Sequence, residues 1–188
     1  MTEPRERILI VDDSETNLLV CQRILENNYE VHTVMSAAEM FTLLETVTPD
    51  IILLDIEMPK MNGYEAARIL KTRDEMKDIP ILFFTSLSET RYEMKGMELG
   101  AVDYISKQPF VAARFYQRVK THLAHAAERK RMRKENETIR IELAGVKAEL
   151  ASVKVELEGV KRDAANDPKA TGGGEAHVES KGDTGCLA

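Results

Sequence analysis

Side chains that can bind a cation or an anionic oxygen stand at the ends of four short segments of the chain. The segments cover residues 8–11, 51–54, 81–84 and 103–106. In this order, they are followed by Asp12 and Asp13, by Asp55, by Thr85 and Ser86, and by Lys107. The first three segments are apolar throughout, which is typical of strands buried on both faces of a parallel sheet. Because ligands bind beyond the carboxyl ends of such strands, we expect these side chains to share one edge of a sheet.

The chemistry of this set follows from its charges. Three carboxylates within a few ångströms repel one another and require a cation. Oxygen ligands alone suit Mg²⁺, which uses few protein ligands and keeps several waters. A hydroxyl group and the Lys107 ammonium nearby can hold the oxygens of a phosphoryl group. The set therefore indicates phosphoryl transfer, in which positioning and charge neutralisation supply most of the catalysis.

Helical periodicity fills the intervals between the predicted strands. Apolar residues recur at helical spacing in four segments, residues 15–27, 36–47, 64–70 and 89–99, and residues 31–34 form a weaker strand candidate. Gly100 is placed to end the fourth helix. Five strands that alternate with helices predict an α/β fold with a doubly wound parallel sheet.

The last predicted helix is unusually long. It begins near Phe110, and no proline interrupts the chain from residue 111 to 166. This stretch contains a seven-residue repeat that covers residues 141–147, 148–154 and 155–161. A helix this long with a heptad repeat indicates a coiled coil.

The heptad positions predict how two copies would pair. Position a holds Asn136, Leu143, Leu150 and Leu157, and position d holds Met132, Ile139, Val146, Val153 and Val160. Position g carries glutamates and position e carries Arg or Lys, so each g–e pair of a parallel dimer joins opposite charges. An antiparallel pair would place like charges together. We therefore expect a parallel homodimer, although leucine at a with β-branched residues at d favours higher oligomers.

A basic run, residues 129–134, precedes the heptads. Its place before a zipper resembles the layout of basic-zipper DNA-binding proteins. The run is short and holds no Asn or Gln that could contact bases, so a solvated or partner-facing collar is the preferred interpretation. We expect no nucleic acid as a partner.

Charge divides the chain into three parts. Residues 1–125 carry a net charge of −6, residues 126–162 carry +3 and residues 163–188 carry −3. We expect a globular domain, a coiled coil continuous with its last helix, and a disordered tail, in that order. The sequence shows no signal peptide and no apolar run that could span a membrane. With only two cysteines, of which Cys21 is expected in the core, a cytoplasmic protein is predicted.

The chain resembles the receiver domains of two-component response regulators over about residues 5–125. Four stretches in the family's order and spacing carry the resemblance: residues 8–13, 53–63, 84–86 and 100–107. The resemblance implies a flavodoxin-like sheet of strand order 2-1-3-4-5. It also implies that the phosphoryl donor is a sensor histidine kinase or a phosphotransfer protein, and that the domain is not an enzyme but assists its own phosphorylation and dephosphorylation.

The resemblance assigns roles residue by residue. Asp55 matches the phosphoacceptor. Asp13 matches a direct Mg²⁺ ligand, Asp12 acts through water, and Glu57 offers its backbone carbonyl to the metal. Thr85 and Lys107 match the residues that bind the phosphoryl oxygens. Tyr104 matches the aromatic residue that turns inward when the threonine moves.

Simpler interpretations exist for these residues. Asp12 and Asp13 could cap the helix that follows, and Asp55 could be a turn residue. Lys107 could be a solvated surface lysine, Thr85 a plain strand residue, and Tyr104 a packed edge residue. One departure from the family concerns Gln108, which separates Lys107 from Pro109 where the family has Pro directly after Lys. The extra residue could move the lysine or shift a cis bond to Gln108–Pro109.

These features predict a signalling switch: Asp55 accepts a phosphoryl group, and the coiled coil changes self-association or binds a downstream protein. No output domain is expected in the roughly 60 residues that follow the receiver. The alternatives are a scaffold that works without phosphate and a DNA-binding regulator that uses the basic run. The sequence names neither the kinase nor the downstream protein.

Overall fold

A five-stranded parallel sheet forms the centre of the computed structural model, which describes residues 5–87 and 89–165. The strands are β1 (Arg7–Val11), β2 (Glu30–Val34), β3 (Ile51–Leu54), β4 (Ile81–Thr85) and β5 (Asp103–Ser106). Their order in the sheet is β2-β1-β3-β4-β5, and every neighbouring pair is parallel. The predicted fold class and strand order are therefore confirmed.

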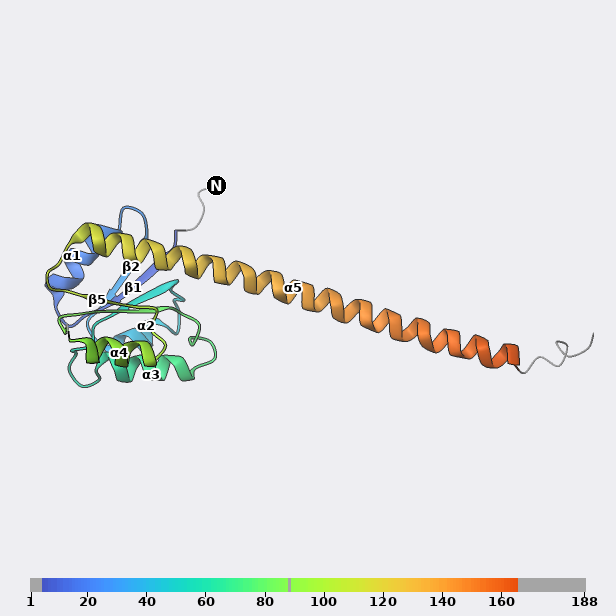
Figure 1. Ribbon diagram of the computed structural model, residues 1–188. Coiled ribbons are helices and arrows are strands. Elements are labelled where there is room, and N and C mark those ends of the chain that lie inside the picture. The colour runs from blue at the N-terminus through green and yellow to red at the C-terminus, as the bar shows by residue number, and fades with distance from the viewer. Residues whose placement is uncertain (1–4, 88, 166–188) are drawn as a thin grey trace, which may run out of the picture. The chain divides into compact units, whose positions relative to one another are not determined.

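Helices connect the strands and cover both faces of the sheet (Figure 1). They are α1 (Glu15–Leu25), α2 (Ala37–Leu43), α3 (Gly63–Thr72), α4 (Thr90–Glu98) and α5 (Ala112–Ala165). Local sequence signals set several ends. Ser14 and Ser36 cap α1 and α2, and Asn62 and Glu65 form a capping box at α3. Gly100 adopts a positive φ of 80° after α4, as expected for a helix-terminating glycine.

The core lies in two layers, one on each face of the sheet. One layer joins alternate strand residues such as Leu9 and Phe83 to α2 and α3, and includes Met40 and Leu70. The other layer joins Ile10 and the remaining strand residues to α1 and the first turns of α5. Strands β1, β3 and β4 are buried from end to end after Arg7, which explains their continuous apolar sequence. Cys21 is buried in the second layer, as predicted.

Helix α5 belongs to two compact units. The first unit ends at Lys134 and the second begins at Glu135. The first unit contains both the predicted receiver domain, residues 1–125, and the basic run, residues 129–134. The helix ends at Ala165, so the predicted coiled coil, residues 126–162, lies within it. The rest of the predicted tail, from residue 166 on, lies outside the described residues.

The long helix is strongly charged. Among the residues that the structure describes, no helix combines the length and the apolar character needed to cross a membrane.

Candidate functional site

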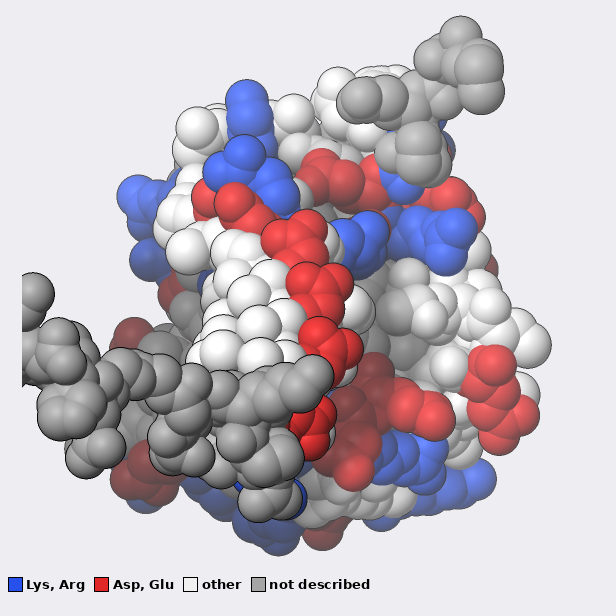
Figure 2. All heavy atoms as spheres, turned by 90° about the vertical axis from the view of Figure 1, so that its right-hand side faces the viewer, with Lys and Arg blue, Asp and Glu red and all other residues white. Residues whose placement is uncertain are grey.

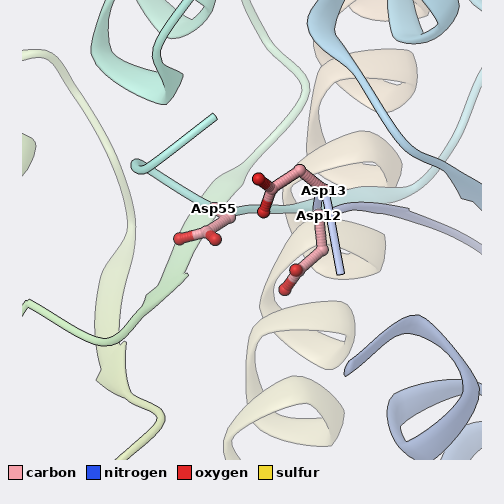
Figure 3. Close-up of side chains that lie close together, drawn as sticks. All are labelled: Asp12, Asp13 and Asp55. Carbon is pink, nitrogen blue, oxygen red and sulfur yellow. The ribbon is translucent and has the colours of Figure 1, made fainter. Parts of the chain in front are cut away.

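Three aspartates gather at the carboxyl ends of β1 and β3. Carboxylate oxygens of Asp12, Asp13 and Asp55 all lie within 4.8 Å of one another (Figure 3). Asp12 and Asp55 are buried, whereas Asp13 is exposed to solvent. The parallel pairing of β1 with β3, which places Val11 beside Leu54, brings these strand ends together. The sequence prediction of a carboxylate cluster at one edge of the sheet therefore agrees with the geometry.

Asp12 links this cluster to the start of α1. Its Oδ1 accepts hydrogen bonds from the Ser14 amide and from Asn17 Nδ2, both at 3.0 Å. The N-cap of α1 is Ser14, so the two aspartates do not cap the helix themselves. The sequence prediction did not include Asn17 among the residues of the site. Its position in the first turn after Ser14 is the only signal that could have placed it there.

Lys107 supplies the positive charge of the cluster. Its Nζ lies 2.7 Å from Asp55 Oδ2 and 2.7 Å from Asp12 Oδ2. The contact with Asp55 is a hydrogen bond. The ammonium is not aligned for one with Asp12 Oδ2, a buried oxygen that therefore has an ion pair but no hydrogen-bond donor among the described residues. Burial alone would lower the pKa of Lys107, but the two carboxylates outweigh it and raise the pKa above its usual range.

The extra residue Gln108 does not keep Lys107 from the cluster. A turn closed by the Ser106 hydroxyl, which donates to the Gln108 carbonyl at 2.7 Å, accommodates it. The cis peptide bond lies between Gln108 and Pro109. The Lys107 amide donates to the Thr85 carbonyl at 2.8 Å, so the lysine stays paired with β4 at the edge of the sheet.

The loop between β3 and α3 folds tightly against Asp55. The Ile56 amide donates to Asp55 Oδ1 at 2.7 Å, and the Glu57 amide approaches the same oxygen at 3.4 Å. A Cβ atom on Gly63 would lie 2.1 Å from the Asp55 carbonyl oxygen, so only glycine fits there. Gly63 thus positions the site. The contribution of the Glu57 carbonyl to a metal stays a prediction.

Thr85 is the last residue of β4, and Tyr104 lies in the neighbouring strand β5. Thr85 is fully buried, and the Leu87 amide approaches its hydroxyl at 3.4 Å. Tyr104 is turned inward: it packs near Phe83, and its hydroxyl donates to the Leu87 carbonyl at 2.6 Å. Burial raises the pKa of Tyr104, so its hydroxyl stays protonated as the donor of this bond. The contact joins the tyrosine to the loop that follows Thr85.

The charges of the site suit a divalent cation. Three carboxylates face a single ammonium, which leaves two negative charges uncompensated. All the ligand atoms on offer are carboxylate oxygens, which magnesium prefers. Asp13 is open to solvent and could bind a hydrated ion. The residues present therefore fit Mg²⁺, held by Asp13 and Asp55 with Asp12 close by.

The family model of the response regulator receiver domain matches residues 8–120. The chain belongs to this receiver family. The match covers the three aspartates, Thr85 and Lys107, and ends within the first turns of α5.

Curated relatives support the same assignment. The polar-differentiation response regulator DivK of Brucella anthropi is 32% identical over 120 residues, which cover 63% of this chain and 97% of DivK. PhoP of Bacillus subtilis, an alkaline phosphatase synthesis transcriptional regulatory protein, is 38% identical over 63% of this chain and 48% of its own. A Vibrio cholerae protein named "Probable cyclic di-GMP phosphodiesterase" is 35% identical over 72% of this chain. The chain spans only 31% of that last relative.

Solved structures share the fold of the receiver. The signal receiver domain of a histidine kinase from Syntrophus aciditrophicus is 35% identical, with a TM-score of 0.58, and the match covers 64% of this chain and 91% of that one. A CheY-like receiver domain protein from Methanospirillum hungatei is 26% identical, with a TM-score of 0.61, over 66% and 98% of the two chains. The long part of α5 lies outside these matches.

Proposed function

We propose that this protein is a response regulator that accepts a phosphoryl group on Asp55 in a Mg²⁺-dependent reaction. The observation that carries this proposal is the pairing of Lys107 Nζ with Asp55 Oδ2 at 2.7 Å, beside two further aspartates. Asp55 is the carboxylate that both the Lys107 ammonium and the Ile56 amide hold in place. Asp55 itself is buried, and the exposed Asp13 marks the side from which a donor can approach.

Each side chain has a role in this proposal. Asp55 is the nucleophile and becomes the aspartyl phosphate. Mg²⁺, bound by Asp13 and Asp55, would neutralise charge on the phosphoryl oxygens. Lys107 would move its ammonium from the Asp55 carboxylate to a phosphoryl oxygen, and the Thr85 hydroxyl would bind another. Tyr104 would hold the loop after Thr85 through Leu87.

The donor in this proposal is a sensor histidine kinase or a phosphotransfer protein, because receivers take phosphoryl groups from phosphohistidine. The domain itself is a phosphoacceptor rather than an enzyme with a diffusible substrate. We place the reaction in the cytoplasm, where such kinases present their phosphohistidine.

The long helix supplies the output in this proposal. Its apolar a and d side chains are half exposed or more, for example Leu143 at 50% and Val153 at 58%. Figure 2 shows a row of acidic side chains along the helix beside an uncharged stripe. Glu158 pairs with Arg162. Within the described part of the helix, no ion pair involves the g and e residues of the repeat, so their charges stay available to a second copy: Glu142, Lys147, Glu149, Lys154, Glu156 and Lys161. We infer a parallel homodimer whose seam contains residues 136, 139, 143, 146, 150, 153, 157 and 160.

Incubation with acetyl phosphate and Mg²⁺ tests the receiver. Intact-mass spectrometry should show one added phosphoryl group on the wild type and none on Asp55→Asn. Beryllofluoride with Mg²⁺ should protect the loop around Leu87 from amide exchange in the wild type alone. A wild type that shows neither change would exclude the switch.

A scaffold that works without phosphate is the second candidate. The exposed apolar side chains of the α5 seam favour it, because the seam does not depend on Asp55. Partner capture by wild type and by Asp55→Ala distinguishes the two: equal capture, with or without beryllofluoride, supports the scaffold. Capture that changes only in the wild type supports the switch.

A further inference from the structure

The basic run, residues 129–134, lies against the receiver itself. Arg133 forms a bidentate ion pair with Asp78: Nη1 donates to Oδ2, and Nη2 donates to Oδ1 at 2.9 Å. Lys130 Nζ lies 3.3 Å from Asp50 Oδ1. Both aspartates belong to loops that lead into β3 and β4, at the edge of the sheet opposite to Asp55. All four residues fall within the first compact unit.

The receiver holds the Asp50 carboxylate and the backbone on either side of Asp78 in place through its own contacts. The Arg7 amide donates to the second oxygen of Asp50 at 2.9 Å. Lys71 donates to the carbonyls of Lys77 and Ile79, the two neighbours of Asp78, at 2.9 and 3.0 Å. The acidic edge, Asp50 and Asp78, is thus ordered by contacts other than those with α5. A fixed pair of acceptors costs the basic run less entropy to bind than two mobile side chains would.

Helical spacing places the two basic contacts on one side of α5. Lys130 and Arg133 are three residues apart and share a face. Met132, the first d position of the heptads, points to the other side and is 53% exposed. The contact with the acidic edge therefore sets the rotation of the helix at the point where the predicted seam begins.

We propose that the acidic edge is a docking site for the basic run of the same chain, and that this clamp fixes the rotational phase with which α5 leaves the receiver. In this clamp, the basic run binds carboxylates of its own chain rather than nucleic acid. Its consequence for pairing rests on the proposed coiled coil, because Met132, the first d position, lies on another face of the helix than the two clamp residues. A guanidinium joined to a carboxylate through two bonds favours one geometry, as a phase-setting contact requires.

The clamp is a surface contact, and its strength is limited accordingly. Arg133 and Asp78 side chains are 64% and 48% exposed. Exposed pairs of this kind shift a local opening equilibrium by about two- to fivefold. Added salt should weaken them further, because the charges face water.

Amide hydrogen exchange of residues 126–137 in the full chain tests the clamp. Asp78→Arg should raise the exchange rate of these helix amides about two- to fivefold. Combining Asp78→Arg with Arg133→Asp should restore the rate of the wild type. Glu75→Arg is the matched control: Glu75 is exposed, lines the same groove at this edge and has the same charge change. It should leave the rate unchanged.

Three outcomes would overturn the clamp: equal exchange in Asp78→Arg and wild type, no recovery in the double variant, or the same increase in Glu75→Arg. Sedimentation velocity on the same samples keeps the two proposals apart. If the protein is a dimer but the double variant does not recover the wild-type exchange rate, the clamp alone is refuted. If the protein is a monomer and the double variant recovers that rate, the proposed pairing of α5 is refuted and the clamp is supported.

Discussion

Lys107 reaches Asp55, with Nζ 2.7 Å from Oδ2, although Gln108 separates the lysine from the proline that follows it. The Lys107 amide is held by the Thr85 carbonyl, so the position of the ammonium depends on β5 and its pairing with β4. The inserted residue lies beyond that hydrogen bond, in the turn closed by Ser106. The lysine and the aspartate are therefore brought together by the sheet.

Replacing Lys107 by methionine removes the positive charge from two buried carboxylates. We expect the free energy of unfolding to fall by about 2 kcal/mol in Mg²⁺-free buffer. This is less than for a fully enclosed ion pair, because the exposed Asp13 leaves the site open to water. The pKa of Lys107 is raised in the fold, so its contribution should be constant from pH 6 to 9 and decline only above about 10.5, where the unfolded lysine deprotonates. Urea unfolding across this pH range measures it. Lys120→Met, at an exposed position, is the control; an equal loss there would contradict the role of the ion pair.

Asp13→Asn should separate charge repulsion from metal binding. In Mg²⁺-free buffer, the variant should be more stable than wild type by about 0.5–1 kcal/mol, because one of three neighbouring carboxylates loses its charge. Wild type should gain about 1.4 kcal/mol when Mg²⁺ is tenfold above its dissociation constant, and the variant much less. Thermal unfolding with and without Mg²⁺ measures both effects. Glu45→Gln, exposed and remote from the cluster, should respond to Mg²⁺ as wild type does.

Tyr104→Phe removes the hydroxyl that donates to the Leu87 carbonyl. We expect the free energy of unfolding to fall by about 1 kcal/mol, and amide exchange in the loop between β4 and α4 to become faster. Tyr64→Phe is a matched control, because its hydroxyl also donates to a backbone carbonyl, that of Tyr92, at 2.7 Å. Similar stability losses with faster loop exchange only in Tyr104→Phe would support the proposed role. Unchanged loop exchange would contradict it.

Cys21 should be chemically inert in the folded protein. The side chain is 1% exposed, and burial together with the charge of Asp12 raises its pKa to about 12. At pH 8.5 we expect iodoacetamide to label Cys21 in urea but not in native buffer, as peptide mass spectrometry would show. Because the unfolded thiol ionises first, this group favours folding below about pH 9 and loses that contribution as the pH rises toward 12. Rapid native labelling would show that the α1 layer opens readily.

Self-association of α5 should be lost when an aspartate is placed at position a, and retained when the same residue is placed outside the seam. Leu150→Asp places a charge at position a and should convert the dimer to a monomer in sedimentation velocity. Ala148→Asp introduces the same side chain two residues away at position f, exposed in any dimer, and should leave the dimer intact. Loss of association in both variants, or in neither, would contradict the assigned heptad frame.

The order of the g and e charges predicts a parallel arrangement. Reversing Glu142, Glu149 and Glu156 to lysine should abolish self-association, because three of the four g–e pairs then join like charges. Mixing this variant with one that carries glutamate at 147, 154 and 161 should restore a complex. Equal self-association of the first variant and wild type would exclude the parallel frame.

Much of the fold could be predicted from local patterns. The apolar runs of β1, β3 and β4 are unbroken because both faces of these strands are buried, so they stand out in the sequence. The sequence pattern of strand β2 is weaker because its residues are only half buried. Helix ends have weaker signals too: the pattern predicts a helix over residues 36–47, but α2 ends at Leu43 and is followed by turns that share its apolar spacing.

The sequence by itself determined the sheet and the carboxylate cluster at the carboxyl ends of its strands, and it predicts the heptad frame, because burial and helical packing impose repeating patterns on neighbouring residues. Only the tertiary structure decided what distant residues do. It showed that Gly63 must lack a side chain beside the Asp55 carbonyl, and that Gln108 leaves Lys107 in place. It also showed that Arg133 binds Asp78, 55 residues away. Such contacts depend on how separate elements meet in space, and a single sequence carries no periodic signal for them.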